Sequence, residues 1–294
     1  MRALIRLLRP HQYIKNGFVL LGLLFATQRD AATATHAALA FLAFCAMASA
    51  VYVLNDLLDA EADRQHPQKC RRPIASGQIK APLAWCACLL LACVALALGA
   101  AVGLAVPALL LTYLALNVAY SLYLKHVVIL DVFVISAGFM LRILAGTVGI
   151  GIAPSQWLLL CGLMVTLFLG FAKRHAELMQ LAAADGPRAG PGGACARPVL
   201  DDYSGVMLGQ FIAVSAACTV LSYSLYTVSR DTIAVHGTAN LIYTVPFVVY
   251  GIFRYLFLLH LRAQGNDTAH DLLTDRHLLL TVACWLAVTF GVLP

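Results

Sequence analysis

Long apolar runs alternate with short polar segments along almost the whole chain. A helix needs about 18 predominantly apolar residues to cross roughly 30 Å of hydrocarbon, and most of the runs reach this length. Their backbone groups must be satisfied within the segment, and runs rich in Leu, Ala and Val favour helices over barrel strands. Nine spans are therefore expected, the first being the shortest, at residues 14–27, 37–55, 82–102, 105–124, 127–150, 155–172, 206–228, 239–260 and 277–293.

Composition places the chain among integral membrane proteins. Hydrophobic residues make up 61% of its 294 residues and charged residues 12%, with a mean hydropathy of +0.83. Soluble domains carry about a quarter charged residues. The longest polar interval, 173–204, is too short to fold alone, and its middle is rich in Gly, Pro and Ala, as in a flexible linker. We expect one all-α polytopic domain over residues 1–294.

The basic residues indicate the orientation of these spans. With nine spans and a cytoplasmic N-terminus, sixteen of the twenty Lys and Arg face the cytoplasm, two face the opposite side and two fall within spans. The net charge of +6 follows mostly from this topology, so it does not indicate nucleic-acid binding. Basic residues before the first run also suit a signal peptide cleaved near Ala32-Thr33-Ala34. Its removal would leave eight spans and the same cytoplasmic face for the charged loops.

Three aspartates follow the second run at helical spacing. Asp56, Asp59 and Asp63 lie at i, i+3 and i+7, so a helix at about 100° per residue places them within roughly 60° of one face. Such carboxylates repel one another unless a cation lies between them, and Mg2+ commonly bridges carboxylates to substrate phosphates. A solvated loop whose acids pair with its own bases is the alternative, but ionisable groups clustered beside a bilayer are functional by default. The basic residues that follow supply countercharge for phosphates and include Lys69, Arg71 and Arg72.

Further polar residues lie at the ends of the fourth and fifth spans. Tyr120 and Lys125 end the fourth span, and Asp131 opens the fifth. Arg142 lies deep in the fifth span, too far from its end for a lone snorkelling side chain. We expect Arg142 to face a partner or a polar cavity, and we predict that Tyr120 and Arg142 help to bind the substrate.

The sixth span ends in a second basic group. Lys173, Arg174 and Glu177 follow Gly170 in quick succession. Lys173 and Glu177 are i, i+4 neighbours that either form a local salt bridge or hold an anionic substrate and its metal.

The last cytoplasmic loop leaves two interpretations open. Asp267, Asp271 and Asp275 form either a second acidic stripe or a capped, solvated turn. Arg254, near the end of the eighth span, is expected to snorkel rather than to bind a ligand.

These motifs resemble the UbiA superfamily of intramembrane polyprenyl transferases. The sequence Asn55-Asp56-x-x-Asp59-x-x-x-Asp63 is similar to the first aspartate motif of that superfamily, and nine helices agree with its fold. A more specific resemblance, to the branch that makes decaprenyl-phosphate phosphoribose, rests on the run from His66 to Gly77 and on several shorter pieces. These pieces are Tyr120-Ser121 with Lys125, the stretch ending at Arg142, Gly170 to Glu177, Arg254-Tyr255 and Gly265 to Arg276.

The resemblance implies a glycosyl transfer. In that branch 5-phosphoribose passes from 5-phosphoribosyl diphosphate (PRPP) to a polyprenyl (decaprenyl) phosphate, diphosphate is released, and the product serves the synthesis of a cell-envelope glycan. Mg2+ held by Asp56, Asp59 and Asp63 with Asn55 would bind the diphosphate, while Asp131 orients a ribose hydroxyl. The implied protein lies in the cell (inner) membrane with its active site facing the cytoplasm, on loops near 56–81, 125–127, 173–204 and 261–276. Assembly as a homo-oligomer, a trimer, is implied by the resemblance alone.

The chain departs from the wider superfamily at one position. Many prenylating members have a second D-x-x-x-D loop after the sixth helix, where this chain has Lys173, Arg174 and Glu177. A largely basic site suits a substrate with several phosphates better than a second metal pair. With Lys125, these two basic residues are candidates for binding the 5-phosphate or the lipid phosphate.

Two other functions are weighed against this one. An aromatic prenyltransferase of the same superfamily would use a polyprenyl diphosphate and a quinone precursor and would not respond to PRPP. A transporter would show intramembrane charges along an ion path and often inverted repeats. The sequence has no evident internal repeat, and its charges crowd one face, which disfavours a transporter.

Overall fold

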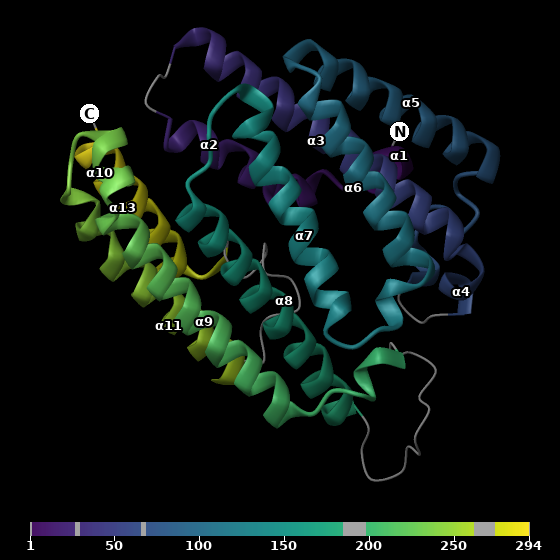
Figure 1. Ribbon diagram of the computed structural model, residues 1–294. Helices are drawn as coiled ribbons and strands as arrows, with labels where there is room; N and C mark the ends of the chain where they lie inside the picture. The colour runs from purple at the N-terminus through teal and green to yellow at the C-terminus, as the bar shows by residue number, and fades with distance from the viewer. Residues whose placement is uncertain (1, 27–29, 66–68, 185–197, 262–273, 294) are drawn as a thin grey trace. The chain divides into compact units, whose positions relative to one another are not determined.

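The computed structural model describes residues 2–26, 30–65, 69–184, 198–261 and 274–293, which contain helices and no strand (Figure 1). These residues form two compact units, the first comprising Met1–Lys125 with Gly138–Ala153 and the second His126–Ala137 with Pro154–Pro294. The expectation of a single domain stays a prediction. An all-helical fold is confirmed.

The first unit contains α1 to α6, the C-terminal part of α7 and four 3-10 helices. Their bounds are α1 Arg2–Leu8, η1 Pro10–Leu20, α2 Leu21–Leu24, α3 Ala31–Leu58, α4 Ala60–Gln65, η2 Lys69–Arg71, α5 Ala81–Val102, α6 Ala105–Leu122, η3 Leu124–His126, α7 Leu130–Ala145 and η4 Val148–Ile150.

The second unit contains the start of α7 and the helices that follow residue 153. Their bounds are α8 Gln156–Ala184, η5 Pro198–Leu200, α9 Gly205–Val228, α10 Arg230–His236, η6 Asn240–Thr244, α11 Val245–Leu261 and α13 Arg276–Val292.

Seven helical segments of the described residues are long and apolar enough to cross a membrane. They are Ala31–Leu58, Ala81–Val102, Ala105–Leu122, Leu130–Ile150, Gln156–Ala182, Gly205–Val228 and Asn240–Leu261, and α13 is a shorter apolar helix of 17 residues. The seven segments and α13 together coincide with eight of the nine expected spans. The remaining one, residues 14–27, falls on η1 and the four-residue α2, and its last residue lies outside the described part of the chain.

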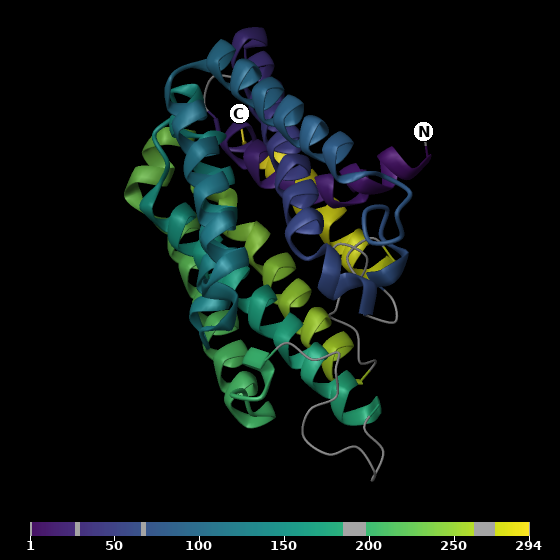
Figure 2. The same cartoon turned by 90° about the vertical axis from the view of Figure 1, so that its right-hand side faces the viewer.

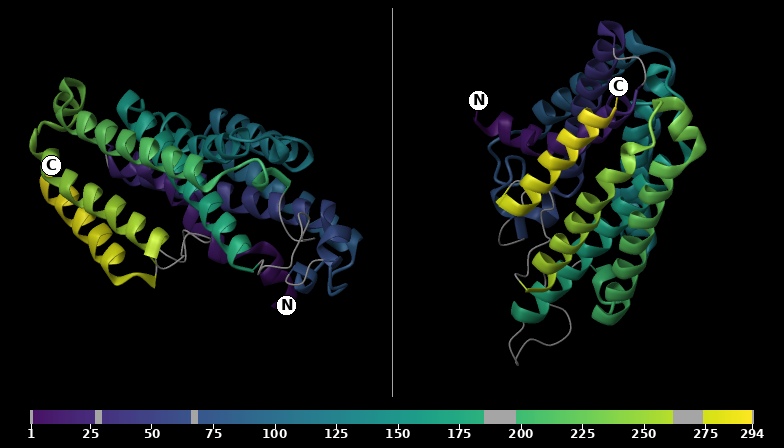
Figure 3. Two further views of the ribbon diagram at one scale, coloured as in Figure 1. Left: turned by 90° about the horizontal axis from the view of Figure 1, so that it is seen from below. Right: turned by 90° about the vertical axis from the view of Figure 1, so that its left-hand side faces the viewer.

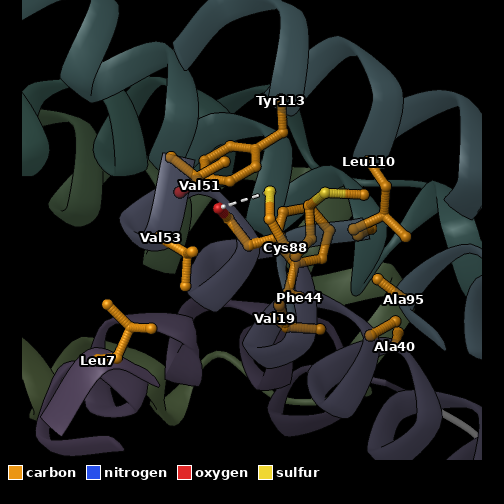
Figure 4. Close-up of a cluster of buried hydrophobic side chains, with 14 of the residues drawn as sticks. Leu7, Val19, Ala40, Phe44, Val51, Val53, Cys88, Ala95, Leu110 and Tyr113 are labelled. Carbon is orange, nitrogen blue, oxygen red and sulfur yellow. Dashed lines mark hydrogen bonds between the residues drawn. The ribbon is translucent and has the colours of Figure 1, made fainter. Parts of the chain in front are cut away.

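The buried helix α3 organises the first unit. It lies beside α5 and also contacts α6 and η1 (Figures 1 and 2). Small residues allow close approach of helices in a membrane, and Ala40, Ala43 and Ala50 on α3 are all fully buried. Larger side chains fill the space between the helices, as Figure 4 shows, and the rings of Phe44 and Tyr113 lie 5.6 Å apart.

Two glycines allow the N-terminal segment to pack closely against another part of the first unit. A Cβ on Gly22 would lie 1.7 Å from the carbonyl oxygen of Gly146, and a Cβ on Gly146 would lie 1.6 Å from that of Val19. The backbone of the segment therefore packs directly against the residues that follow α7. The glycines are needed here for the absence of a side chain, because any Cβ would collide with a backbone atom.

In the second unit, α8 and α9 lie side by side, as do α11 and α13 (Figures 1 and 3). Arg254 on α11 forms a two-pronged ion pair with Asp275, with contacts of 3.2 and 2.7 Å. The Asp275 carboxylate also accepts a hydrogen bond from the Leu278 N–H and so caps α13. Of the two expected interpretations of the last loop, Asp275 fits the capped turn, whereas Asp267 and Asp271 lie outside the described residues. Arg254 pairs with a carboxylate, which the expectation of simple snorkelling did not include.

Candidate active site

The end of α3 and the start of α4 carry the aspartate motif. Asp56 lies in the last turn of α3, Asp59 lies between the helices, and Asp63 lies on α4. Helical spacing continues across the junction, because the N–H of Asp59 donates to the Asn55 carbonyl (2.9 Å) and that of Asp63 to the Asp59 carbonyl (2.8 Å). Asp56 and Asp63 are 2% and 3% exposed, whereas the Asp59 side chain is 41% exposed. The predicted shared face therefore holds for Asp56 and Asp63, and Asp59 points to a different partner.

One guanidinium nitrogen joins the two buried carboxylates. Nη1 of Arg72 lies 3.1 Å from Oδ1 of Asp56 and 2.7 Å from Oδ2 of Asp63. The sequence predicted aspartates on one face with a cation between them. In the structure that cation is Arg72.

The loop that presents Arg72 is folded by its own hydrogen bonds. The N–H of Ser76 donates to the Arg72 carbonyl (2.9 Å), and that of Ile79 donates to the Pro73 carbonyl (3.0 Å). Gly77 has φ of 76°, a left-handed conformation that glycine adopts without strain. The run from Arg72 to Gly77 thus encodes a turn that fixes the backbone beneath the arginine.

A second arginine at the site comes from the N-terminus. Nη2 of Arg9 lies 2.6 Å from Oδ1 of Asp56, and its guanidinium lies 5.1 Å from the Tyr52 ring centre. The hydroxyl of Ser49 donates to the Leu8 carbonyl (2.9 Å) and so fastens the chain beside Arg9 to α3. The sequence interpretation missed this residue and counted it only as a positive charge. Contacts between residues 47 positions apart follow no local spacing that would have revealed it.

The end of α6 completes the cluster. The Ser121 hydroxyl donates to the Asn55 side-chain oxygen (2.7 Å), and Nζ of Lys125 lies 3.4 Å from Oδ1 of Asp59. Tyr120 is half-buried next to them. The structure therefore brings Lys125 to the aspartate motif as the partner of Asp59, and Ser121 as the partner of Asn55.

Arg142 is buried in the first unit and is held by neutral partners. Its guanidinium donates to Asn16 Oδ1 (2.7 Å), the Gly138 carbonyl (2.7 Å) and the Tyr113 hydroxyl (3.0 Å). It also lies over the ring of Tyr113, 4.7 Å from its centre. In the described part of the chain no carboxylate pairs with Arg142. The expected partner exists, and these contacts favour a structural role over the predicted role in substrate binding.

In the second unit a separate network forms around Asp131. This residue is fully buried, and its Oδ2 lies 2.9 Å from Nε of the equally buried Arg174. Arg174 also pairs with Glu177, one helical turn later on α8. The Tyr203 hydroxyl donates to Asp131 Oδ1 (2.8 Å) and accepts from the Ile129 N–H (2.6 Å). Burial and the hydrogen bond to Asp131 raise the pKa of Tyr203, so its hydroxyl remains a donor at neutral pH.

This network changes the interpretation of the second basic group. Asp131 and Arg174 are committed to each other, which suits them to hold α7 and α8 together rather than to contact a substrate. Lys173 is half-buried on α8 beside them. The sequence left open whether Glu177 forms a local salt bridge or helps to hold substrate and metal, and in the structure Glu177 pairs with Arg174. The helix continues to Ala184, so residues 173–184 are not the loop that the sequence suggested.

The remaining basic residues of the first motif differ in exposure. Lys69 on η2 is half-buried, whereas Arg71 is exposed. Neither forms one of the ion pairs with Asp56, Asp59 or Asp63 that the described residues show.

The donor set around Asp56 fits a divalent cation in one specific respect. Within the described residues, no group of three or more His, Cys, Asp or Glu is arranged to hold a metal ion. However, a single nitrogen of Arg72 contacts oxygens of both Asp56 and Asp63, so one positively charged atom can bridge the pair. Carboxylate oxygens, together with the amide oxygen of Asn55, are the hard ligands that Mg2+ prefers. The residues therefore fit the metal, provided that it takes the place of the arginine.

Comparison with known proteins places the chain in a family. The model of the UbiA prenyltransferase family matches residues 17–273. Decaprenyl-phosphate phosphoribosyltransferase of Corynebacterium glutamicum is 34% identical over 299 residues, which cover 97% of this chain and 84% of that protein. The enzyme of the same name from Mycobacterium tuberculosis (strain H37Rv) is 33% identical, covering 98% of this chain and 95% of that protein.

A solved structure supports the fold. A UbiA homolog from Archaeoglobus fulgidus, bound to GPP and Mg2+, superposes with a TM-score of 0.71 over 98% of each chain, at 18% identity. Likeness at this identity concerns the fold alone. Family match, relatives and fold agree over nearly the whole chain, and the protein therefore belongs to the UbiA prenyltransferase family.

Proposed function

We propose that this protein transfers 5-phosphoribose from PRPP to a polyprenyl phosphate, with decaprenyl phosphate as the expected acceptor, and releases diphosphate in a Mg2+-dependent reaction. The product would be a precursor for a cell-envelope glycan. The observation that carries the proposal is the buried Asp56–Asp63 pair bridged by one positively charged nitrogen. The phosphoribosyl donor is supported by the names of the relatives that align over nearly the whole chain.

The chemistry demands stabilisation of a leaving group. The bond between the anomeric carbon of the ribose and the diphosphate oxygen breaks, and a bond to an oxygen of the lipid phosphate forms. Positive charge develops on the ribose and negative charge on the diphosphate, so cationic groups near the diphosphate lower the barrier. The lipid phosphate is already an anion at neutral pH and needs no strong general base.

Residues of the first unit supply those cationic groups. Asp56 and Asp63 with Asn55 would hold Mg2+, which supplies charge neutralisation for the diphosphate when bound. Arg72 borders both carboxylates and Arg9 borders Asp56, and both add positive charge there. A metal contact from Asp59, which the structure pairs with Lys125, remains a prediction.

The remaining basic residues are candidates for binding phosphate groups or for positioning other residues. Lys69 and Arg71 stay predicted contacts of the diphosphate, and Lys125 and Lys173 stay predicted contacts of the 5-phosphate or the lipid phosphate. For Arg174 the buried pairing described above supports a positioning role.

Tyr120 and Asp131 are the remaining candidates for contact with the substrate. Tyr120 stays a predicted substrate contact at the end of α6. Asp131 was predicted to orient a ribose hydroxyl, and its burial against Arg174 instead supports a role in holding α7 to α8.

Nine membrane crossings are part of the proposal. The 11 residues of η1 rise about 2.0 Å each as a 3-10 helix, and the four of α2 about 1.5 Å each, which gives roughly 28 Å. This length approaches the hydrocarbon thickness of about 30 Å, although an α-helix of the same 15 residues would reach only about 22 Å. With α13 as a further crossing, the chain has nine spans, a cytoplasmic N-terminus and the aspartate motif on the cytoplasmic face of the cell (inner) membrane, in agreement with the distribution of Lys and Arg. Assembly as a homo-oligomer, a trimer, remains a prediction.

A donor-exchange assay tests the proposal. Purified protein in detergent receives Mg2+ and decaprenyl phosphate with PRPP labelled in its ribose, and label is followed into the lipid phase. A parallel reaction contains a labelled prenyl diphosphate and 4-hydroxybenzoate. We expect label to reach the lipid phase from PRPP and no transfer from the prenyl diphosphate. Transfer only from the prenyl diphosphate would overturn the proposal and assign the protein to the aromatic prenyltransferases of the family.

A further inference from the structure

Arg72 occupies the position that a metal would need. Its Nη1 lies between the carboxylates of Asp56 and Asp63, within 3.1 Å of one oxygen of each. A divalent cation that bridged the same oxygens would lie close to this nitrogen, and the two positive centres would repel each other strongly. The arginine and the metal therefore compete for the carboxylate pair.

We propose that Arg72 is an exchangeable counter-ion: it neutralises Asp56 and Asp63 in the substrate-free enzyme, leaves when a divalent cation binds, and then contacts the diphosphate of the donor. This inference rests on the proposed function and adds a binding order to it. Arg72 thereby couples the binding of metal to the binding of donor.

The charges of the cluster support the exchange. The formal charges of the two carboxylates, Arg72 and Arg9 add up to zero, so the substrate-free site is neutral. When a divalent cation replaces Arg72, the two carboxylates, Arg9 and the metal sum to +1, and the released guanidinium adds a further positive charge nearby. The site becomes attractive to an anion only after the metal has entered. A multiply charged diphosphate is an anion that satisfies both positive groups.

The surroundings of Arg72 allow its side chain to move while its backbone stays. The side chain is 28% exposed, so it has access to solvent. Its carbonyl accepts the hydrogen bond from Ser76, and the following residues Pro73 and Ile74 are buried, which fixes the start of the side chain. Arginine carries a long flexible stem with a planar head suited to phosphate oxygens. The head can exchange carboxylates for phosphates without movement of the loop.

Arg9 has the contacts of a permanent counter-ion. It touches only Asp56 of the pair, at the same Oδ1 that Arg72 contacts, and it also lies against the Tyr52 ring. A carboxylate oxygen has two lone pairs, so the contact of Arg9 does not depend on that of Arg72. The chain around it is fastened to α3 through Ser49, whose oxygen is hydrogen-bonded to Leu8 and lies 2.8 Å from the Tyr13 hydroxyl. Arg9 therefore continues to neutralise Asp56 when Arg72 leaves.

The exchange makes metal and donor binding cooperative. Metal alone must break the two contacts of Arg72, and the freed guanidinium regains partners only when a diphosphate is present. Each ligand therefore strengthens the binding of the other, by an equal factor, and couplings of this kind typically amount to about 5- to 150-fold.

Arginine reactivity in the unmodified protein tests the exchange directly. The wild type in detergent is treated with phenylglyoxal, and modification of individual arginines is followed by peptide mass spectrometry. The rate at Arg72 is expected to rise severalfold on addition of Mg2+ and to fall again on further addition of inorganic pyrophosphate. Arg9 is the internal reference, because its side chain is similarly exposed, at 24%, and its rate should not rise with Mg2+. An unchanged or slower reaction at Arg72 in Mg2+ would overturn the proposal.

A charge-neutral variant gives the second test. Binding of Mn2+ to substrate-free protein is measured by electron paramagnetic resonance for the wild type, Arg72→Gln and Arg64→Gln. Arg64 is exposed on α4 and forms none of the ion pairs seen in the described ranges. Arg64→Gln therefore removes one positive charge without changing a contact of Asp56 or Asp63. Arg72→Gln should bind Mn2+ on the order of tenfold more tightly than the wild type, and Arg64→Gln should differ little. Weaker or equal binding in Arg72→Gln would contradict the competition.

The two proposals fail separately. Transfer from PRPP without a change of arginine reactivity would overturn the exchange and leave the proposed function in place. Absence of transfer from PRPP would overturn the function, whatever the reactivity of Arg72. The phenylglyoxal experiment needs only folded wild-type protein, so it remains decisive if Arg72→Gln does not fold.

Discussion

Replacing Arg142 with methionine is expected to destabilise the first unit. The substitution removes three hydrogen bonds, and Asn16 and Tyr113, which are 1% and 4% exposed, keep buried oxygens without that donor. An unsatisfied buried acceptor costs about 1–3 kcal/mol, and the lost contact of the cation with the Tyr113 ring costs about 1–2 kcal/mol. Relief from burying a guanidinium without a carboxylate partner offsets part of this loss. We therefore expect a net destabilisation of about 2–4 kcal/mol.

Buried thiols provide the assay for this variant. Cys45 and Cys88 are 4% and 7% exposed, whereas Cys86 and Cys93 are exposed, so labelling of Cys45 and Cys88 themselves, resolved by peptide mass spectrometry, reports unfolding of the first unit in detergent. Arg142→Met should react at a temperature several degrees below that of the wild type, whereas the exposed-site control Arg64→Gln should unfold with the wild type.

Kinetics separate a structural Arg142 from one that binds substrate. Arg142→Lys retains the charge but not the three-way hydrogen bonding, so its stability should fall while the KM for PRPP stays close to that of the wild type. A variant as stable as the wild type, with a KM raised tenfold or more, would refute the structural assignment and restore the role in substrate binding.

Three further substitutions test contacts within the two units, one in the first and two in the second. Gly146→Ala should reduce folded yield, because the new Cβ would lie 1.6 Å from a backbone oxygen of η1; a wild-type melting temperature in size-exclusion-purified protein would contradict this close approach. Tyr203→Phe leaves Asp131 without its hydroxyl donor and should lower the melting temperature by an amount equivalent to about 1–3 kcal/mol, whereas an unchanged value would show that the network contributes little. Asp275 has its pKa lowered from 3.8 to about 2, mainly by its hydrogen bond to Arg254, so its contribution is complete above about pH 4 and is lost as pH falls through 2. Thermal unfolding from pH 2 to 6 should therefore show a stability difference between wild type and Arg254→Gln that is present at pH 6 and disappears near pH 2; a difference independent of pH would exclude this ion pair as its cause.

The sequence pattern predicted the structural features that depend on residues close together in the chain. Apolar runs of sufficient length predicted α3, α5, α6, α7, α8, α9, α11 and α13, because a membrane leaves few other ways to satisfy the backbone. The i, i+7 relation predicted that Asp56 and Asp63 share a face. The proximity of Arg72 in sequence suggested a countercharge, although its position between the carboxylates required the turn that ends at Gly77.

Contacts between distant segments were beyond the reach of the pattern. Arg9 reaches Asp56 only because the N-terminal segment packs along α3, and no motif connects the two positions. The partner of Arg142 is Asn16, an amide whose importance depends on its burial. The commitment of Arg174 to Asp131 arises because the start of α7 packs against α8 within the second unit. In each case a tertiary contact decides whether a charged side chain is available to a ligand.

Product analysis of an aspartate variant tests the central claim most directly. Wild-type protein and Asp63→Asn, both shown to be folded by their elution and melting profiles, are incubated with Mg2+, PRPP and decaprenyl phosphate, and the lipid fraction is analysed by mass spectrometry. We predict a lipid heavier than decaprenyl phosphate by one phosphoribosyl group in the wild type, its absence without Mg2+, and its loss in the variant. Formation of that lipid by folded Asp63→Asn at the wild-type rate, or independently of a divalent cation, would contradict the proposed role of the aspartate pair.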